Sequence, residues 1–192
     1  MKVGEKLGIK ASSRFEDKLV ELKAKVDDLD VVKRKLTSLG AHYMGTFRQN
    51  DVYFNVPEGR LKQREVEGSK EAELVYYERE NIVGPKRSDV FIMKIQEPAV
   101  FKILLEKLLK TRAIVEKVRE IYQYQGTLLA SKRRYVKIHL DKVKELGMFV
   151  EFEMKTSDQT GERDRQILWN LMDELGIKPE QLERLSYVDL IS

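Results

Sequence analysis

The sequence contains no cysteine, and this absence excludes several kinds of chemistry at once. Disulfides, thiolate metal sites and cysteine nucleophiles are all ruled out. Long apolar runs are also missing, because no stretch approaches the ~20 apolar residues that cross a bilayer. The beginning of the chain, Met1 to Lys18, is polar and mixed in charge, unlike a secretory signal. We therefore expect a cytoplasmic protein without a membrane span.

Familiar catalytic motifs are equally scarce. No glycine-rich phosphate loop, Ser-His-Asp set or histidine-based zinc motif can be read in the sequence. The net charge of +4, from 36 basic and 32 acidic residues, is too small to indicate nucleic-acid binding by itself. With 192 residues and 42% hydrophobic content, we expect a single domain over residues 1–192, with 1–15 as a tail or irregular lead-in.

Charged residues are present in an unusual pattern: they recur two apart inside segments that otherwise read as buried strands. Residues i and i+2 of a strand lie on the same face, roughly 7 Å apart. The residues that recur in this way are Glu21, Lys23, Lys62, Arg64, Lys117, Arg119, Lys137, His139, Asp141, Glu151 and Glu153. The pattern predicts strands with one apolar and one ionised face. Ionised faces that meet would line a hydrated tunnel for a polyanion and a divalent metal.

Periodicity and turn residues predict about eight mostly antiparallel strands and a few helices. Strands are expected at 16–26, 41–56, 60–66, 73–79, 91–97, 113–125, 128–140 and 147–156. Helices are expected at about 28–39, 98–110 and 162–175 and from Pro179, with Asn81–Asp89 as a loop. On the second helix Val100, Ile103, Leu104 and Leu108 share one side, which we expect to cover a strand face. The predicted fold class is α+β, with the charged strand faces pointing at each other around a solvated centre and the apolar faces covered by helices.

Glu151 and Glu153 are the sharpest local feature. Two carboxylates on one strand face form a hard oxygen site suited to Mg²⁺ or Mn²⁺, and Glu21 can complete it. The alternative is an exposed edge strand on which two glutamates limit aggregation.

The basic residues are the second feature. A triphosphate carries about four negative charges, so several guanidinium and ammonium groups must converge on it. The candidates are Lys62, Arg64, Arg79, Lys117, Arg119, Arg133 or Arg134, and Lys137. An ordinary solvated surface is the alternative, and it fits charge pairs flanked by apolar residues less well.

Several short motifs occur in an order that resembles a known family. They are Leu19–Lys23, Asp51–Phe54, Gly59–Glu65, Leu74–Arg79, Gly84–Ser88, Lys117–Arg119, Ile138–Val143, Leu146–Glu153 and Ser186–Leu190. Together they resemble the CYTH superfamily of triphosphate tunnel metalloenzymes, in particular its class IV adenylate cyclase (CyaB-like) branch. Leu19 stands where that family has its first glutamate, and Lys62 and Lys137 stand where arginine is usual.

The resemblance implies that the α+β fold is an eight-stranded antiparallel β-barrel with a charged interior and covering helices. Its tunnel would bind ATP, inorganic triphosphate or thiamine triphosphate with Mg²⁺ or Mn²⁺. It implies metal ligands at Glu21, Glu151 and Glu153, and catalytic residues at Lys23, Arg119 and Asp141. The phosphate-binding residues that it implies are Lys62, Arg64, Arg79, Lys117, Arg119, Arg133 and Lys137.

The activity implied first is conversion of ATP to cyclic AMP and pyrophosphate. A triphosphatase of the same fold stays open, as does a tunnel that binds triphosphate without turnover because of Leu19. The sequence also allows a homodimer, and single-stranded RNA binding is the least favoured alternative.

Overall fold

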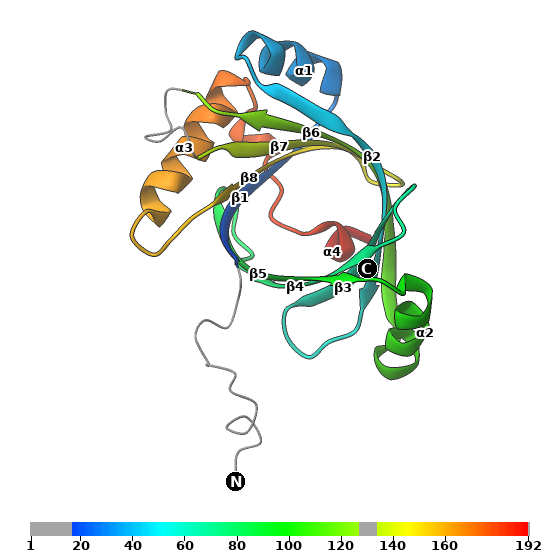
Figure 1. Cartoon of the computed structure of the whole chain (residues 1–192). Coiled ribbons are helices and arrows are strands. Elements are labelled where there is room, and N and C mark those ends of the chain that lie inside the picture. The colour runs from blue at the N-terminus through cyan, green and yellow to red at the C-terminus, as the bar shows by residue number, and fades with distance from the viewer. Residues whose placement is uncertain (1–16, 127–133, 192) are drawn as a thin grey trace.

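A computed structural model describes residues 17–126 and 134–191, which form a closed barrel of eight strands (Figure 1). Around the barrel the strand order is β1-β5-β4-β3-β2-β6-β7-β8, and every neighbouring pair is antiparallel. The strands are β1 Asp17–Val26, β2 His42–Phe54, β3 Arg60–Val66, β4 Ala72–Arg79, β5 Lys86–Ile95, β6 Thr111–Tyr124, β7 Val136–Val143 and β8 Gly147–Lys155. The helices are α1 Leu29–Ser38, α2 Pro98–Leu109, α3 Gly161–Glu174, the short η2 Pro179–Gln181 and α4 Tyr187–Ile191. The α+β class and the eight-stranded antiparallel barrel predicted from the sequence are confirmed.

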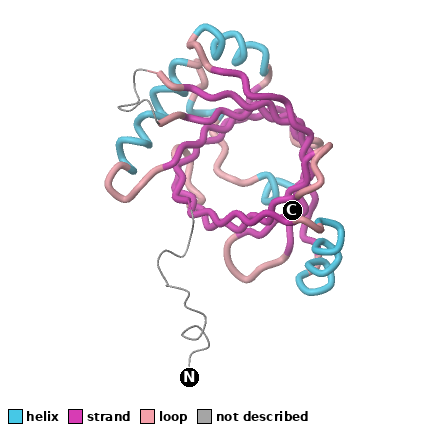
Figure 2. Tube along the Cα trace, in the orientation of Figure 1, coloured by secondary structure: helices cyan, strands magenta, loops and turns pink. Residues whose placement is uncertain are grey.

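The strands turn their apolar faces outward and their ionised faces inward. Successive side chains of a strand point to opposite faces, so Val20, Leu22 and Ala24 of β1 lie outside while Glu21 and Lys23 line the interior. The outward residues of β1, β7 and β8 pack under α1 and α3 and form the largest apolar core. Figure 2 shows α1, α2 and α3 outside the ring of strands. Burial of these apolar faces against helices leaves the barrel interior for charged groups.

Helix α1 begins and ends where its sequence predicts. The carboxylate of Asp28 accepts a hydrogen bond from the backbone N–H of Asp30 at 2.7 Å, which satisfies a donor at the helix N-terminus. Gly40 follows the helix with φ of 75°, a left-handed conformation that glycine adopts without strain.

Two strands, β5 and β7, differ from the sequence prediction by more than two residues. β5 begins at Lys86, inside the expected loop Asn81–Asp89, because Lys86 pairs with Glu21 of β1 in the barrel wall. The sequence did not indicate a strand here, because Lys86 and Ser88 are polar residues, yet both are buried in the barrel. β7 covers Val136–Val143 rather than 128–140, and its last residue pairs with Lys117 of β6. Residues 128–133 of the expected strand lie outside the described residues.

Helix α2 contacts the barrel through a different face from the one predicted. Phe101, Leu105 and Leu109 pack on outward residues of β2, β3 and β4. The four side chains expected to cover the barrel, Val100, Ile103, Leu104 and Leu108, are instead 49–69% exposed. Both sides of this helix are apolar, so helical periodicity alone could not choose between them.

The C-terminal segment crosses one end of the barrel, where α4 lies inside the outline of the strands (Figures 1 and 2). Tyr187 and Val188 are buried there in an apolar cluster with inward-facing residues of the barrel: Tyr53, Val115, Val143 and Phe149. This cluster fills that end of the interior. Among the helices of the described ranges, none has the length and apolar character needed to cross a membrane.

Candidate active site

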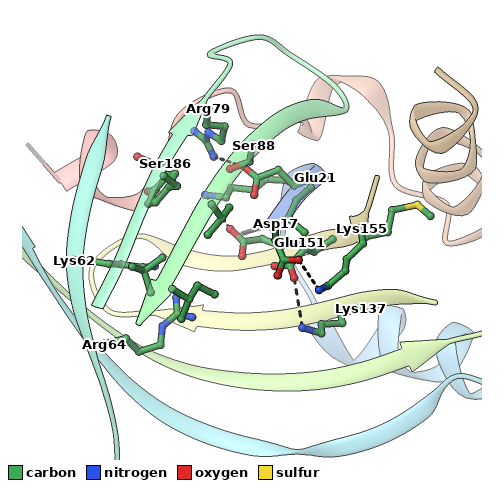
Figure 3. A pocket seen from close by; sticks show the side chains of 18 of the residues that line it. Asp17, Glu21, Lys62, Arg64, Arg79, Ser88, Lys137, Glu151, Lys155 and Ser186 are labelled. Atoms are coloured by element: carbon green, nitrogen blue, oxygen red, sulfur yellow. Dashed lines mark hydrogen bonds and ion pairs between the residues drawn. The ribbon is translucent and has the colours of Figure 1, made fainter. Parts of the chain in front are cut away.

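A cavity of about 240 Å³ occupies the interior between α4 and the opposite rim of the barrel. Figure 3 shows its walls, with Lys62 and Arg64 on one side and Glu21 and Arg79 on another. Its charged lining residues include Glu21, Lys23, Lys62, Arg64, Arg79, Lys117, Arg119, Lys137, Glu151 and Glu153. The barrel therefore brings to one cavity almost every charged residue that the two-residue pattern singled out.

Asp51 organises the deepest group of cations. Its carboxylate is completely buried and accepts hydrogen bonds from Lys62 Nζ at 2.9 Å, Arg64 Nε at 2.8 Å and Lys117 Nζ at 2.5 Å. The cations come from β3 and β6, which flank β2 on either side. Three cations thus share one carboxylate, which leaves this region with an excess of positive charge.

The shared carboxylate and the burial change the acidities in this group. Burial would raise the pKa of Asp51, but Arg64, Lys117 and Lys62 hold it well below its ordinary value. Burial, with the nearby Arg64, lowers the pKa of Lys62 to about 7. Burial also lowers the pKa of Lys117 to about 8. The two lysines therefore lie close to losing a proton, and a bound anion would favour their charged forms.

A second charged group centres on Arg119. Its guanidinium binds Asp141 through Nε at 2.7 Å and Nη2 at 2.5 Å, and Nη2 also lies 2.5 Å from Glu151 Oε2. The hydroxyl of Tyr187 donates to Asp141 Oδ2 at 2.7 Å. Lys23 Nζ lies 3.1 Å from Glu151 Oε1 and 3.6 Å from the centre of the Tyr187 ring. The three expected catalytic residues, Lys23, Arg119 and Asp141, therefore belong to one connected network.

The three expected metal ligands line the same cavity but have different surroundings. Glu21 and Glu153 are register partners on β1 and β8, so two like charges face each other across the pair, which a cation between them would stabilise. Within residues 17–126 and 134–191 each has one ion pair, Arg79 at 3.1 Å for Glu21 and Lys137 at 3.6 Å for Glu153. Glu151 is instead bound by Lys23 and Arg119.

The donor set fits a magnesium ion that keeps other oxygen ligands. Within the described ranges, no group of three or more acidic or histidine side chains is arranged to hold a metal by itself. Mg²⁺ is usually held by one or two carboxylates together with water and substrate phosphates. Glu21 and Glu153 supply such a pair. The assignment of Glu21, Glu151 and Glu153 as metal ligands stays a prediction.

The rim of the cavity combines charge with an apolar wall. Lys137 and Arg134 both line it, and Arg134 is held by an ion pair of 2.7 Å to the buried Asp164. The other candidate, Arg133, lies outside the described residues. Leu19 faces the cavity and packs against Val75 and Val90. The position where the resembling family has a glutamate is therefore part of a small apolar surface.

Lys86 is a buried cation that the sequence analysis did not single out. Its side chain is completely buried, and its Nζ donates to the backbone carbonyls of Glu183 at 2.9 Å and Arg184 at 3.1 Å. Burial, with the nearby Arg79, lowers the pKa of Lys86 to about 8. Arg79 Nη2 also donates to the Arg184 carbonyl, at 3.1 Å. These two residues fix the C-terminal segment against the cavity, and the Gly-Pro-Lys motif was the only sequence signal for Lys86.

Comparison with known proteins agrees with this architecture. A protein of Methanocaldococcus jannaschii named "Putative adenylate cyclase" is 28% identical over 183 residues, which is 89% of this chain and 97% of that protein. The solved structure of the PH1012 protein of Pyrococcus horikoshii is 28% identical, with a TM-score of 0.78 over 91% of this chain and 99% of that one.

A more distant structure shares the fold. It is that of a Hippeastrum adenylyl cyclase homologue described as having a dominant triphosphatase activity. It is 15% identical, with a TM-score of 0.63, and covers 90% of this chain and 94% of that one.

The family model of the CYTH domain matches residues 17–187, which span the whole barrel and reach the first residue of α4. With the closed eight-stranded barrel and its charged interior, this match shows that the chain belongs to the CYTH domain family.

Proposed function

We propose that this protein binds a triphosphate in its barrel and catalyses metal-dependent phosphoryl transfer on it. The observation that carries the proposal is the convergence of Lys62, Arg64, Lys117 and Arg119 on one cavity, with Glu21 and Glu153 paired on another wall. Phosphoryl transfer needs positioning and charge neutralisation more than covalent help from the protein. A buried set of fixed cations supplies both.

To bind the phosphates, the cations would exchange contacts with carboxylates of the protein for contacts with phosphate oxygens. Arg64 and Arg119 can each grip two phosphate oxygens, while Lys62 and Lys117 act as point charges. Asp51 and Asp141 hold these side chains in place before substrate arrives, so little ordering remains to be done on binding. Mg²⁺ or Mn²⁺, held by Glu21 and Glu153 together with substrate oxygens, would neutralise phosphate charge and activate the attacking oxygen.

For the activity itself we propose cyclisation of ATP. The ribose 3′-oxygen would form a bond to the α-phosphorus, the bond from that phosphorus to its bridging oxygen would break, and pyrophosphate would leave while the hydroxyl proton passes to water. The apolar surface of Leu19, Val75 and Val90 supports a substrate with an organic group beside its phosphates. Inorganic triphosphate has nothing to place against such a surface.

A triphosphatase is the second candidate, and the loosely held Glu153 favours it. Its carboxylate is 3.6 Å from Lys137, its single ionic contact among the described residues, and its side chain is 27% exposed at the rim of the cavity. Such a carboxylate can accept a proton from a water that attacks the terminal phosphorus. Binding without turnover is the third candidate, because Leu19 provides no carboxylate to the metal.

One set of assays separates these candidates. ATP and inorganic triphosphate are supplied separately with Mg²⁺ or Mn²⁺, and cyclic AMP, pyrophosphate and orthophosphate are measured. Cyclic AMP with pyrophosphate indicates the cyclase, and orthophosphate indicates the triphosphatase. Tight binding without products indicates a tunnel that binds triphosphate without turnover.

The metal assignment is tested with Glu153→Gln. We expect this variant to lose at least ~100-fold in metal-dependent turnover, since it removes a charged ligand, with little change in thermal stability. The matched control is Glu116→Gln on β6, whose side chain is 54% exposed and pairs with Lys144. An unchanged rate in Glu153→Gln would show that this carboxylate does not serve the metal.

A further inference from the structure

One hydroxyl group in the wall of the cavity is buried without a hydrogen-bond partner. Ser88 of β5 is 1% exposed and lines the cavity (Figure 3). Among residues 17–126 and 134–191 its Oγ has no hydrogen-bond partner. Ser186 also lines the cavity, but its Oγ donates to Asp189 Oδ2 at 2.5 Å. Buried polar groups are normally hydrogen-bonded, so a ligand in the cavity can supply the bond that Ser88 lacks.

The strand register places Ser88 at the boundary between the charged and the apolar part of the wall. Its cross-strand neighbours are Leu19 on β1 and Arg79 on β4. Side chains paired in this way have their Cβ atoms roughly 5 Å apart. Leu19 belongs to the small apolar surface of the cavity, whereas Arg79 binds Glu21 at 3.1 Å. The free hydroxyl therefore lies between an apolar and an ionised neighbour.

The same order of side chains continues along β5. Lys86, Ser88 and Val90 share one face of the strand, roughly 7 Å apart. Lys86 binds the backbone just before α4, whereas Val90 is paired with Asp17 at the first residue of β1. From the end closed by α4 toward the open rim, the wall is thus charged, then hydroxylic, then apolar. A nucleoside triphosphate carries its phosphates, its sugar hydroxyls and the flat faces of its base in the same order.

The local charge favours a neutral hydroxyl over a phosphate oxygen beside Ser88. The guanidinium of Arg79 already binds Glu21 Oε1 at 3.1 Å and the carbonyl of Arg184 at 3.1 Å. A phosphate oxygen at this position would meet the Glu21 carboxylate, and the unbalanced positive charge of the cavity lies around Asp51. A sugar hydroxyl brings no charge, and it can both donate to and accept from a serine hydroxyl.

We propose that Ser88 hydrogen-bonds the 2′-hydroxyl of a ribonucleoside triphosphate and so selects ribonucleotides over deoxyribonucleotides. The 2′-hydroxyl is assigned because the 3′-oxygen is the attacking group in the proposed cyclisation. This proposal rests on the function proposed above, since it needs the phosphates of the ligand at the cations of the cavity.

The first test compares four ligands by calorimetric titration of the wild-type chain. They are ATP, 2′-deoxyATP, 3′-deoxyATP and inorganic triphosphate, each titrated with Ca²⁺ and again with EDTA, so that binding with and without a metal is seen. One hydrogen bond between uncharged groups should make ATP bind about 3–10-fold more tightly than 2′-deoxyATP. The analogue 3′-deoxyATP should bind like ATP, because it keeps the 2′-hydroxyl.

The second test uses Ser88→Ala, which removes a hydroxyl that has no partner in the described protein and should leave the unfolding midpoint unchanged. We expect this variant to bind ATP and 2′-deoxyATP equally, since the preference needs both hydroxyls. Its affinity for inorganic triphosphate should stay within about twofold of wild type, because that ligand has no sugar. The matched control is Ser38→Ala on α1, where Oγ donates to the Arg34 carbonyl at 3.0 Å, and it should keep the full preference.

Four results would overturn the proposal. They are equal binding of ATP and 2′-deoxyATP by the wild type, a preference that persists in Ser88→Ala, a loss of affinity with 3′-deoxyATP alone, and equal losses of ATP and inorganic triphosphate binding in Ser88→Ala. The last result would assign Ser88 to the phosphates.

The same titrations separate this proposal from the function on which it rests. If the wild type binds inorganic triphosphate but does not distinguish the sugars, only the role of Ser88 fails. If it binds none of the four ligands under either condition, the proposed function fails and the role of Ser88 fails with it.

Discussion

Asp51 offers the sharpest test of how the tunnel is built. Its carboxylate is completely buried and is shared by Lys62, Arg64 and Lys117. Asp51→Asn keeps the shape of the side chain but leaves three buried cations without their anion. Removing one partner of a buried ion pair costs roughly 3–5 kcal/mol, because the remaining charge stays desolvated. Asparagine retains one acceptor oxygen, so we expect about 3 kcal/mol.

The loss should be visible in thermal unfolding. For a chain of this size, 1 kcal/mol corresponds to roughly 2–4 °C, so the unfolding midpoint of Asp51→Asn should fall by about 6–12 °C. Inorganic triphosphate should raise the midpoint of the variant more than that of the wild type, because its oxygens replace the missing anion. Circular dichroism with and without about 1 mM triphosphate measures both effects.

The control variant removes one of the three cations instead of the one carboxylate that they share. Lys62→Met removes one of three cations and leaves Asp51 with Arg64 and Lys117, so it should cost far less than Asp51→Asn. A midpoint within about 3 °C of wild type for Asp51→Asn, or an equal loss for Lys62→Met, would refute this account. If Asp51→Asn folds only with triphosphate present, Asp51→Glu provides a variant that keeps the charge for the same comparison.

Two further predictions concern the buried lysines. Because burial lowers the pKa of Lys62 to about 7 and of Lys117 to about 8, the unfolded chain binds more protons than the folded protein above pH 7, and stability of the empty protein should rise from pH 7 to pH 9. The affinity for triphosphate should fall over the same pH range. Binding at pH 8 should take up protons, which calorimetry in two buffers can detect. A stability that does not change with pH, in the wild type and in Lys62→Met alike, would contradict the predicted rise in stability. Lys86→Met removes the donor to the carbonyls of Glu183 and Arg184 and should cost about 1–3 kcal/mol, with faster hydrogen exchange confined to residues 183–191. Equal acceleration throughout the barrel would show that Lys86 does not act on the C-terminal segment.

The strands of the barrel could be predicted because charged and apolar residues alternate along them. Glu21 and Lys23 between Val20, Leu22 and Ala24 identify one ionised and one apolar face without any knowledge of the fold. What joins these faces into a closed ring is long-range pairing, such as Glu21 with Glu153 and Lys117 with Val143, and no local pattern encodes it. The resemblance to a known family supplied that step.

The remaining differences arise where local pattern and tertiary position conflict. The polar residues Lys86 and Ser88 indicated an exposed loop, but they are buried strand residues. Polar residues are usually exposed, and this expectation fails in a barrel whose interior is charged. Helix α2 is apolar on both sides, so its position against the barrel could not be deduced from periodicity. Asp51 was seen only as part of a motif, since a lone carboxylate gives no sign of the three cations that surround it.

The apolar cluster beneath α4 has a kinetic consequence. Because Tyr187, Val188 and their neighbours fill that end of the barrel, we expect ligands to enter and leave at the opposite rim. Whatever lies deeper during turnover must then depart last. If phosphates are held near Lys62 and Lys117, pyrophosphate would outlast the cyclic nucleotide in the tunnel, and its escape rather than bond formation would limit the steady-state rate.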